Sequence, residues 1–329
     1  LHLTLADGTT NTLKNTTANN DGWPGIRCGW GSVLVIDDSI RNLDTNNQIV
    51  TPKNGMIGED VTLIGGQTLK AGDPITNMDS TNRGVLIAQG WGQSAGIGGG
   101  PKENGGTIII NGGDITSTSS SSGNLSYSNG AGIGGGAGGS GTTITINGGK
   151  VVAQAGYCGS GIGSGLGYYE GSGNMSCTAK ADAIDIPTGK ANDQGYGFFD
   201  SFTAEFQTGN VQSPGSRHYH TVAGDITLNG GYVFAKSGGH GNAFGQSCGH
   251  GPASNKNHLV RITGGTMITE ADPNINNPWL YSIGARLGYT IVTGGSVFVQ
   301  NRTTGQKQPM FQGIGDTAFN TTGISAFST

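Results

Sequence analysis

The sequence has little charge and no long hydrophobic run. Only 12% of its 329 residues are Asp, Glu, Lys or Arg, and the formal net charge at pH 7 is −4. A protein that binds nucleic acid or an anionic membrane surface usually carries clustered Lys and Arg, and this chain does not. No apolar stretch reaches the length of a transmembrane helix. We therefore expect no nucleic-acid partner and no transmembrane segment.

Cysteine is also scarce. None of the four cysteines stands in a paired C-x-x-C spacing, which argues against a zinc site. An even number in a secreted chain favours disulfides, and four cysteines allow three pairings. We expect Cys158 to pair with Cys177 around one loop, and Cys28 and Cys248 to join distant parts of the chain or neighbouring subunits. Buried free thiols are the alternative.

Glycine is abundant and periodic. Glycine (64) and proline (10) together make up about 22% of the chain, just below the level typical of low-complexity disorder. Gly-Gly pairs begin at positions 112, 148, 230, 264 and 294, so the separations are 36, 82, 34 and 30 residues. A repeat of about 30 to 36 residues favours an ordered array, and the long separation contains an insertion.

Alternating apolar residues flank each Gly-Gly pair, as in Thr143-Ile-Thr-Ile-Asn-Gly-Gly-Lys-Val-Val-Ala-Gln154. Alternation predicts strands with one buried face, and glycine permits the turn between them. Asn-Gly is also a strong hairpin signal, so a row of self-paired hairpins is the alternative. We favour a solenoid, because a lone hairpin of this size cannot bury its apolar side, whereas stacked repeats form a continuous core.

The second half of each repeat places one branched residue among glycines, at Ile97, Ile133 and Ile162, with weaker copies at Ile283 and Ile314. A single Ile from a strand otherwise free of side chains fits a narrow coil. The predicted fold class is therefore all-β: a parallel β-solenoid, either a β-helix or stacked β-arches, of roughly 30–36-residue repeats.

The repeats divide the chain into five parts. Residues 1–60 form an atypical start, in which Trp23 and Trp30, beside Cys28, are expected to cover the first coil. Residues 61–167 form a solenoid that begins with a degenerate arch at 61–66. An insertion rich in aromatic and acidic residues follows at 168–224. The solenoid resumes at 225–318, and 319–329 form a C-terminal tail that closes the last coil or pairs with something else.

The insertion holds the candidate catalytic residues, because inserted loops on solenoids commonly form binding surfaces. Two carboxylates can act as an acid and base on either side of a glycosidic bond. No spacing in this chain is diagnostic, and solvated loop residues are the simpler interpretation. The candidates are Asp182, Asp185, Asp200, Glu205, Arg217, His218 and His220.

No motif predicts a cofactor or a metal. The segment 240–250 contains His240, Cys248 and His250, but it occupies the place of the Gly-Ile-Gly run and is interpreted as a decorated turn. Asp37-Asp38 lacks the oxygen-rich loop of a calcium site. The glycine runs are not phosphate loops, because no Gly-Lys-Ser/Thr follows them.

Two features favour a secreted protein. The sequence begins with Leu1 rather than Met, which is typical of a processed chain. Asn-X-Ser/Thr sequons permit surface glycosylation. They lie at Asn15, Asn124, Asn174, Asn301 and Asn320.

The combination of Ile-Asn-Gly-Gly-x-Val with Ala-Gly-Ile-Gly-Gly-Gly, at 107–115, 131–136 and 144–152, resembles the repeats of secreted and cell-surface solenoid proteins of anaerobic microbes. It covers roughly residues 85–315. In composition the chain also resembles the glycine-rich strand proteins of methanogen sheaths, whose arches stack edge to edge. The first resemblance implies the architecture, and the second implies a wall-forming protein.

We expect an extracellular structural protein that assembles with itself, edge to edge, into a cell-surface layer, sheath, tube or fibre. Solenoids usually block their terminal strands with charge, proline or a helix, and this sequence offers little of these. The alternative is a solenoid that binds or cleaves cell-surface glycans through the insertion 168–224.

Overall fold

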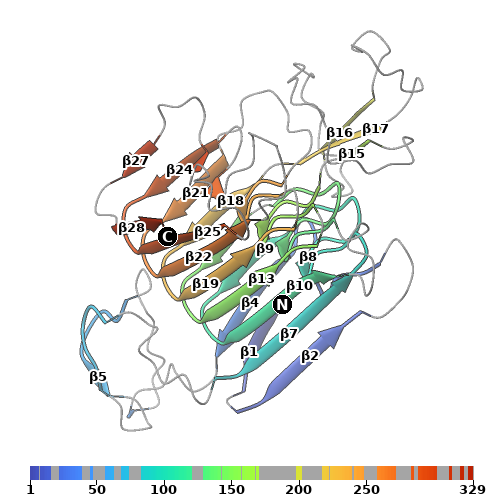
Figure 1. Cartoon of the computed structure of the whole chain (residues 1–329). Coiled ribbons are helices and arrows are strands. Elements are labelled where there is room, and N and C mark those ends of the chain that lie inside the picture. Colours follow the sequence, from blue (N-terminus) through green and yellow to red (C-terminus); the bar gives the residue numbers. More distant parts are fainter. Residues whose placement is uncertain are drawn as a thin grey trace.

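The computed structural model of the chain is built from β-strands (Figure 1). It describes residues 1–6, 8–15, 22–38, 45–46, 56–62, 68–73, 83–120, 129–141, 143–156, 158–166, 168–169, 198–201, 217–221, 223–238, 241–247, 258–271, 283–284, 288–301, 311–312, 319–321 and 325–328. Within these residues every regular element is a strand. Three long sheets contain most of the strands, and every strand pair in them is parallel.

Sheet A contains the strands that precede the five Gly-Gly turns, together with the equivalent strands of the other coils. Its strands are, in spatial order, β1 (His2–Leu5), β4 (Val33–Asp38), β9 (Thr107–Ile110), β12 (Thr143–Ile146), β18 (Asp225–Leu228), β21 (His258–Ile262), β24 (Gly288–Val292) and β27 (Phe319–Thr321).

Sheet B is formed by the strand that follows the turn. Its strands are β2 (Thr10–Lys14), β7 (Val85–Trp91), β10 (Asp114–Ser120), β13 (Lys150–Gln154), β19 (Tyr232–Lys236), β22 (Thr266–Ala271), β25 (Ser296–Asn301) and β28 (Ser325–Ser328).

Sheet C is formed by the short strands of the Gly-Ile-Gly runs. Its strands are β3 (Ile26–Arg27), β8 (Ile97–Gly98), β11 (Ile133–Gly134), β14 (Ile162–Gly163), β20 (Phe244–Gly245), β23 (Ile283–Gly284) and β26 (Phe311–Gln312). The chain visits sheets A, B and C in turn, so each coil contains three strands. The predicted parallel β-solenoid is confirmed, and the hairpin alternative is wrong for these repeats.

The core is a set of columns in which equivalent residues of successive coils lie side by side. In sheet A, Ile108 pairs in register with Ile144, which pairs with Ile226. All three are fully buried, as are the sheet C residues Ile97, Ile133 and Ile162. Neighbouring coils thus bury each other's apolar side chains, which is the source of stability in a repeat protein.

Glycine is required where coils approach most closely. Gly134 has a φ of 134°, which L side chains rarely adopt, and a Cβ there would overlap the carbonyl oxygen of Gly163 in the next coil. Gly98, Gly163 and Gly245 repeat this geometry. The second glycine of each turn also has positive φ, for example 83° at Gly149. The glycine period of the sequence therefore reflects the coil-to-coil distance.

Two short antiparallel sheets interrupt the stack. β5 (Val61–Thr62) pairs with β6 (Thr68–Leu69) between β4 and β7. β17 (Arg217–His220) pairs with β15 (Tyr168–Tyr169) and β16 (Phe198–Ser201) between β14 and β18. The degenerate arch expected at 61–66 is thus wrong, because Val61 and Thr62 belong to an antiparallel pair outside sheets A, B and C. The three long sheets begin at His2, within the segment expected to form an atypical start, and the tail supplies β27 and β28.

Candidate assembly interface

The N-terminal end of the stack consists of β1, β2 and β3, which are the terminal strands of sheets A, B and C. Each strand pairs on one side only. The Val35 N–H donates to the Leu1 carbonyl and the Asn15 N–H to the Gln89 carbonyl, so the odd-numbered residues of β1 and β2 face the next coil. In a parallel ladder the alternate residues point the other way. The backbone groups of Thr4 and Thr12 therefore face away from the stack.

Apolar side chains are exposed at this end. Leu1 is 72% exposed, Leu13 44%, Trp23 56% and Trp30 50%. Leu13 pairs in register with Ala88, which is fully buried, so Leu13 continues a core column to its open end. Trp23 and Trp30 lie at this end with about half of each residue exposed. The end coil therefore leaves unburied the apolar surface that an interior coil hides against its neighbour.

A charged and aromatic cluster borders the end of sheet C. Arg27 donates two hydrogen bonds to Glu103, from Nε to Oε2 at 3.1 Å and from Nη2 to Oε1 at 3.0 Å. The Gly100 N–H donates to Glu103 Oε2 at 2.9 Å, and the Arg27 guanidinium lies 5.4 Å from the centre of the Trp23 ring. This bidentate geometry is among the stronger forms of ion pair. It fixes Arg27 beside the open edge without leaving an unpaired carboxylate.

A column of polar side chains runs along the corner between sheets A and B. The amide of Asn111 donates to Asp37 at 2.7 Å, Asn147 to Asn111 at 2.8 Å, and Asn229 to Asn147 at 2.9 Å. The Thr263 hydroxyl donates to Asn229 at 2.8 Å. We call these five residues the corner ladder. Every donor lies one coil nearer the C-terminal end than its acceptor, and His2 Nε2 forms a hydrogen bond with Asp37 at the N-terminal end.

The sequence carries a signal for this ladder. Asn111, Asn147 and Asn229 each precede a Gly-Gly pair at the repeat interval, and Asn-Gly is also a turn signal. Their hydrogen-bond partners follow from the parallel register of the strands, which the sequence pattern does not specify. Leu13, Arg27 and Glu103 carry no motif, and sequence reasoning missed them.

The C-terminal end is formed by β26, β27 and β28, the last strands of sheets C, A and B. They run parallel to their neighbours, as the strands at the other end do. Within the residues that the structure describes, no strand lies beyond them. The two ends of the stack therefore present backbone edges of the same direction in all three sheets.

The candidate catalytic residues of the insertion are described only in part. Asp182, Asp185 and Glu205 lie outside the described residues. Asp200 in β16 stands opposite His218 in β17, and Ser201 stands opposite Arg217. His220 stands opposite Phe198. The strand register therefore places one carboxylate residue opposite one imidazole residue, and no catalytic role follows from this pairing.

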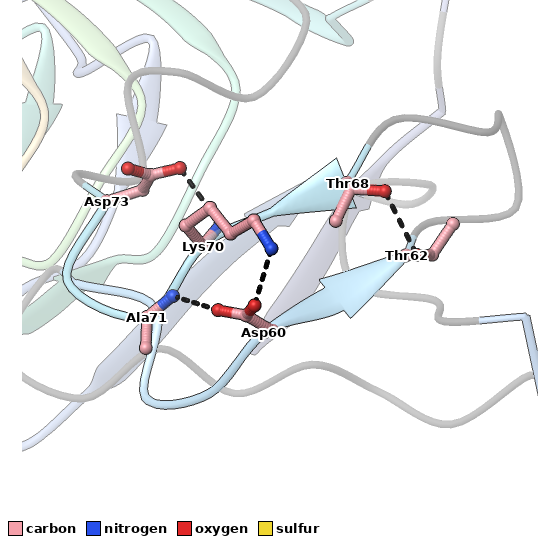
Figure 2. Close-up of polar contacts among 6 residues, drawn as sticks. All are labelled: Asp60, Thr62, Thr68, Lys70, Ala71 and Asp73. Atoms are coloured by element: carbon pink, nitrogen blue, oxygen red, sulfur yellow. Dashed lines mark hydrogen bonds and ion pairs between the residues drawn. The ribbon is translucent and has the colours of Figure 1, made fainter.

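The excursion at β5 and β6 is held by local polar contacts (Figure 2). Lys70 Nζ lies 2.6 Å from Asp60 Oδ2, and the Ala71 N–H donates to Asp60 Oδ1 at 2.9 Å. The Lys70 N–H donates to Asp73 at 2.9 Å, and the hydroxyls of Thr62 and Thr68 lie 3.1 Å apart across the strands. The hydrogen bond with Lys70 lowers the pKa of Asp60, and the same bond raises the pKa of Lys70. This acidic group is already paired with a cation.

The cysteines differ in state. Cys28 is a free thiol that is 1% exposed, so the expected disulfide from Cys28 to a distant part of the same chain is wrong. Burial raises the pKa of Cys28. Cys158 is fully buried and disulfide-bonded. Cys177 and Cys248 lie outside the described residues.

Among the sequons, the amide of Asn15 donates to the Trp23 carbonyl at 3.0 Å at the end of β2. Asn301 ends β25 and Asn320 lies in β27. Asn124 and Asn174 lie outside the described residues. The sequon at Asn15 is therefore placed at the open N-terminal end.

The described residues contain no group of three or more His, Cys, Asp and Glu side chains arranged to hold a metal ion. Nor do they include a helix of the length and hydropathy needed to cross a membrane. Comparison with known proteins gave no match: no protein-family model, no curated protein and no solved structure is significantly similar to the chain.

Proposed function

We propose that this chain is a structural protein of the cell surface that assembles with copies of itself, head to tail, into a sheath, layer, tube or fibre. The single observation that supports this is the pair of open ends. Sheets A, B and C each terminate at both ends in a strand with no described partner on its outer side. Unpaired strand edges are templates for pairing with another chain.

The parallel topology sets the geometry of such an assembly. All strands of the three long sheets point the same way, so a second copy in the same orientation continues every sheet when it is placed at the N-terminal end. That contact is heterologous and does not close upon itself with two subunits. It therefore gives a filament, or a ring where the rotation closes.

The exposed apolar residues supply a driving force. Full burial of an apolar side chain of this size contributes about 1.5–3 kcal/mol, and Leu1, Leu13, Trp23 and Trp30 are the candidates. Association of two proteins costs roughly 4–15 kcal/mol in lost translational and rotational freedom. Because gain and cost are similar in size, assembly depends on concentration, and the backbone hydrogen bonds of three sheet edges add to the gain.

An extracellular location is part of the proposal. The disulfide at Cys158 and the sequons at Asn15, Asn301 and Asn320 suit an oxidising environment and a glycosylated surface. The low charge also suits a wall, because few ionisable groups leave little pH-dependent destabilisation.

Electron microscopy and light scattering of the purified chain test the proposal. We expect filaments that grow with protein concentration. The variant Thr4→Pro/Thr12→Pro removes one outward N–H from each of two terminal strands and leaves the hydrogen bonds to β4 and β7 in place. It should remain folded and monomeric.

The matched control is Thr4→Val/Thr12→Val, which retains both N–H groups and should form filaments like the unaltered chain. Circular dichroism and thermal unfolding confirm that both variants fold. A wild-type chain that stays monomeric at millimolar concentration would remove the proposal, and so would filaments that the proline variant forms equally well.

A further inference from the structure

The outward face of sheet B carries an apolar stripe. Along β7 and β19 the residues alternate between buried and half-buried, so the half-buried ones point away from the core. One outward column is mainly apolar, and Thr116 of β10 interrupts it. The sheet B stripe consists of Ile87, Val152, Phe234, Ile268 and Phe298.

The corresponding face of sheet A is different. Over the same coils its central outward column contains Val35, Ile109, Thr145, Thr227, Arg261 and Ile291 in register. Thr145 and Thr227 are polar, and Arg261 is exposed. Both sheets belong to the same coils and have the same strand spacing, so the fold does not require an apolar outward column. The stripe on sheet B is a property of the sequence.

The charges beside the stripe neutralise each other within the sheet. Lys150 Nζ lies 3.3 Å from Asp114 Oδ2 on one side of it. Lys236 Nζ lies 3.1 Å from Glu270 Oε1 on the other side, where both side chains are less than one-fifth exposed. A partner that covers this face therefore meets paired charges rather than isolated ones, and the cost of desolvation is reduced.

We propose that the sheet B face is a lateral interface at which two copies of this chain pack sheet B against sheet B. An apolar column flanked by internally paired charges is complementary to itself, as a two-fold contact requires. Packed sheets lie about 10 Å apart and bury their facing side chains. The proposal rests on the head-to-tail assembly proposed above.

The size of the face explains why it needs that assembly. Six strands, about 4.8 Å apart, each contribute three outward residues spaced about 6.6 Å, which gives roughly 500 Å² per copy. Stable interfaces bury about 800 Å² per partner, so a single pair of copies holds together weakly. Copies joined end to end repeat the contact, and the second contact forms at a high effective concentration. The stripe therefore bundles filaments rather than forming stable dimers.

The test compares Phe234→Thr/Ile268→Thr with the control Ile109→Thr on the outward face of sheet A. Threonine retains the preference for strands in all three substitutions. Electron microscopy measures filament width, and sedimentation separates single filaments from bundles. We expect bundles from the unaltered chain and from the control, and single filaments of unchanged length from the sheet B variant.

The outcomes separate the two proposals. Bundles that persist in the sheet B variant, or filaments of the unaltered chain that never bundle, overturn the lateral interface and leave the head-to-tail proposal standing. If no filament forms, head-to-tail assembly fails. Sedimentation equilibrium at millimolar concentration then decides: a dimer lost only in the sheet B variant supports the interface, and a monomeric unaltered chain overturns it. Adsorption to insoluble cellulose or chitin that depends on Phe234, without bundling, also overturns it.

Discussion

The middle of the stack and its N-terminal end are built from the same three sheets but differ in what they bury. Ile108, Ile133 and Ile144 are fully buried, whereas Leu13 is 44% and Trp23 56% exposed at the end coil. The difference arises from the number of neighbours. An interior coil is covered on both sides, and the end coil on one. The position of a residue in the stack therefore determines its contribution to the free energy of unfolding more than its residue type does.

We expect the largest difference in stability between an interior coil and the end coil when a glycine is substituted. Gly134→Ala places a Cβ against the Gly163 carbonyl at a φ of 134°, and we expect a loss of at least about 3 kcal/mol in the free energy of unfolding. Gly31→Ala is the matched control at the end, because Gly31 also has positive φ but open space around it. It should cost about 1–2 kcal/mol. Urea unfolding measures both, and equal losses would contradict the close-approach explanation.

Truncation of an apolar side chain should likewise cost more stability in an interior coil than in the end coil. Ile144→Ala opens a cavity between two coils and should cost about 2–5 kcal/mol. Leu13→Ala removes a half-exposed side chain and should cost less than about 1 kcal/mol. Both are measured by urea unfolding in the Thr4→Pro/Thr12→Pro background, so that assembly does not contribute. If Leu13→Ala costs as much as Ile144→Ala there, the end coil is covered by something other than a second copy.

In the corner ladder we expect a smaller difference in stability between an interior position and an end position. Asn147→Ala removes a donor to Asn111 and an acceptor from Asn229, and we expect a loss of about 1–3 kcal/mol. Asn11→Ala at the exposed end removes two longer hydrogen bonds of 3.3 Å each and should change stability by less than about 0.5 kcal/mol. Thermal unfolding compares the two variants. A neutral Asn147→Ala would mean that water replaces the ladder.

The Cys28 thiol is a probe of how well the N-terminal end of the stack is buried. Its pKa is raised above 9.0 by desolvation, so the folded state favours the neutral thiol. Such a group stabilises the fold below pH 9.0 and loses that contribution as the pH rises through the folded-state value. Stability should fall more steeply above pH 9 in the unaltered chain than in Cys28→Ala. Alkylation should also be slow in the native protein and fast in urea; rapid native labelling would show that the end coil opens.

The smallest effect is expected at the β5 and β6 excursion. The pKa of Asp60 is lowered, so its pairing with Lys70 is lost as the pH falls through the folded value, below 3.8. The pKa of Lys70 is raised, so the pairing is also lost above 10.5. Both side chains are more than half exposed, and unfolding curves of Asp60→Asn at pH 7 should match those of the unaltered chain. A measurable loss would show that this excursion supports the stack.

Sequence patterns located the interior coils because each coil repeats two physical requirements. Gly148-Gly149 marks the tight turn, and Ile162 among glycines marks the close approach in sheet C. The Gly-Gly pattern does not mark the first coil, because Asp7-Gly8 replaces the pair between β1 and β2. Gly65-Gly66 causes the opposite error. This pair follows an alternating run and so predicts a coil, yet β5 and β6 on either side of it pair antiparallel. Local chemistry sets a turn, and only the register of distant strands decides what pairs with what.

The candidate interface was harder to predict for the same reason. Leu13 and Ile144 are both apolar residues in alternating runs, and nothing in those runs shows that one has neighbours on both sides and the other on one side. The expectation of open edges came from the scarcity of charge and proline. The residues that form the edge became known only from the sheet order.

The corner ladder has a consequence for growth. The four hydrogen bonds between its side chains all orient their protons toward Asp37, so the local dipoles add rather than cancel along the stack. Copies arranged in one direction would repeat that alignment and give the polymer chemically distinct tips. Subunit arrival and departure would then proceed at different speeds at the two tips, and a wall made of this protein would have a front and a back.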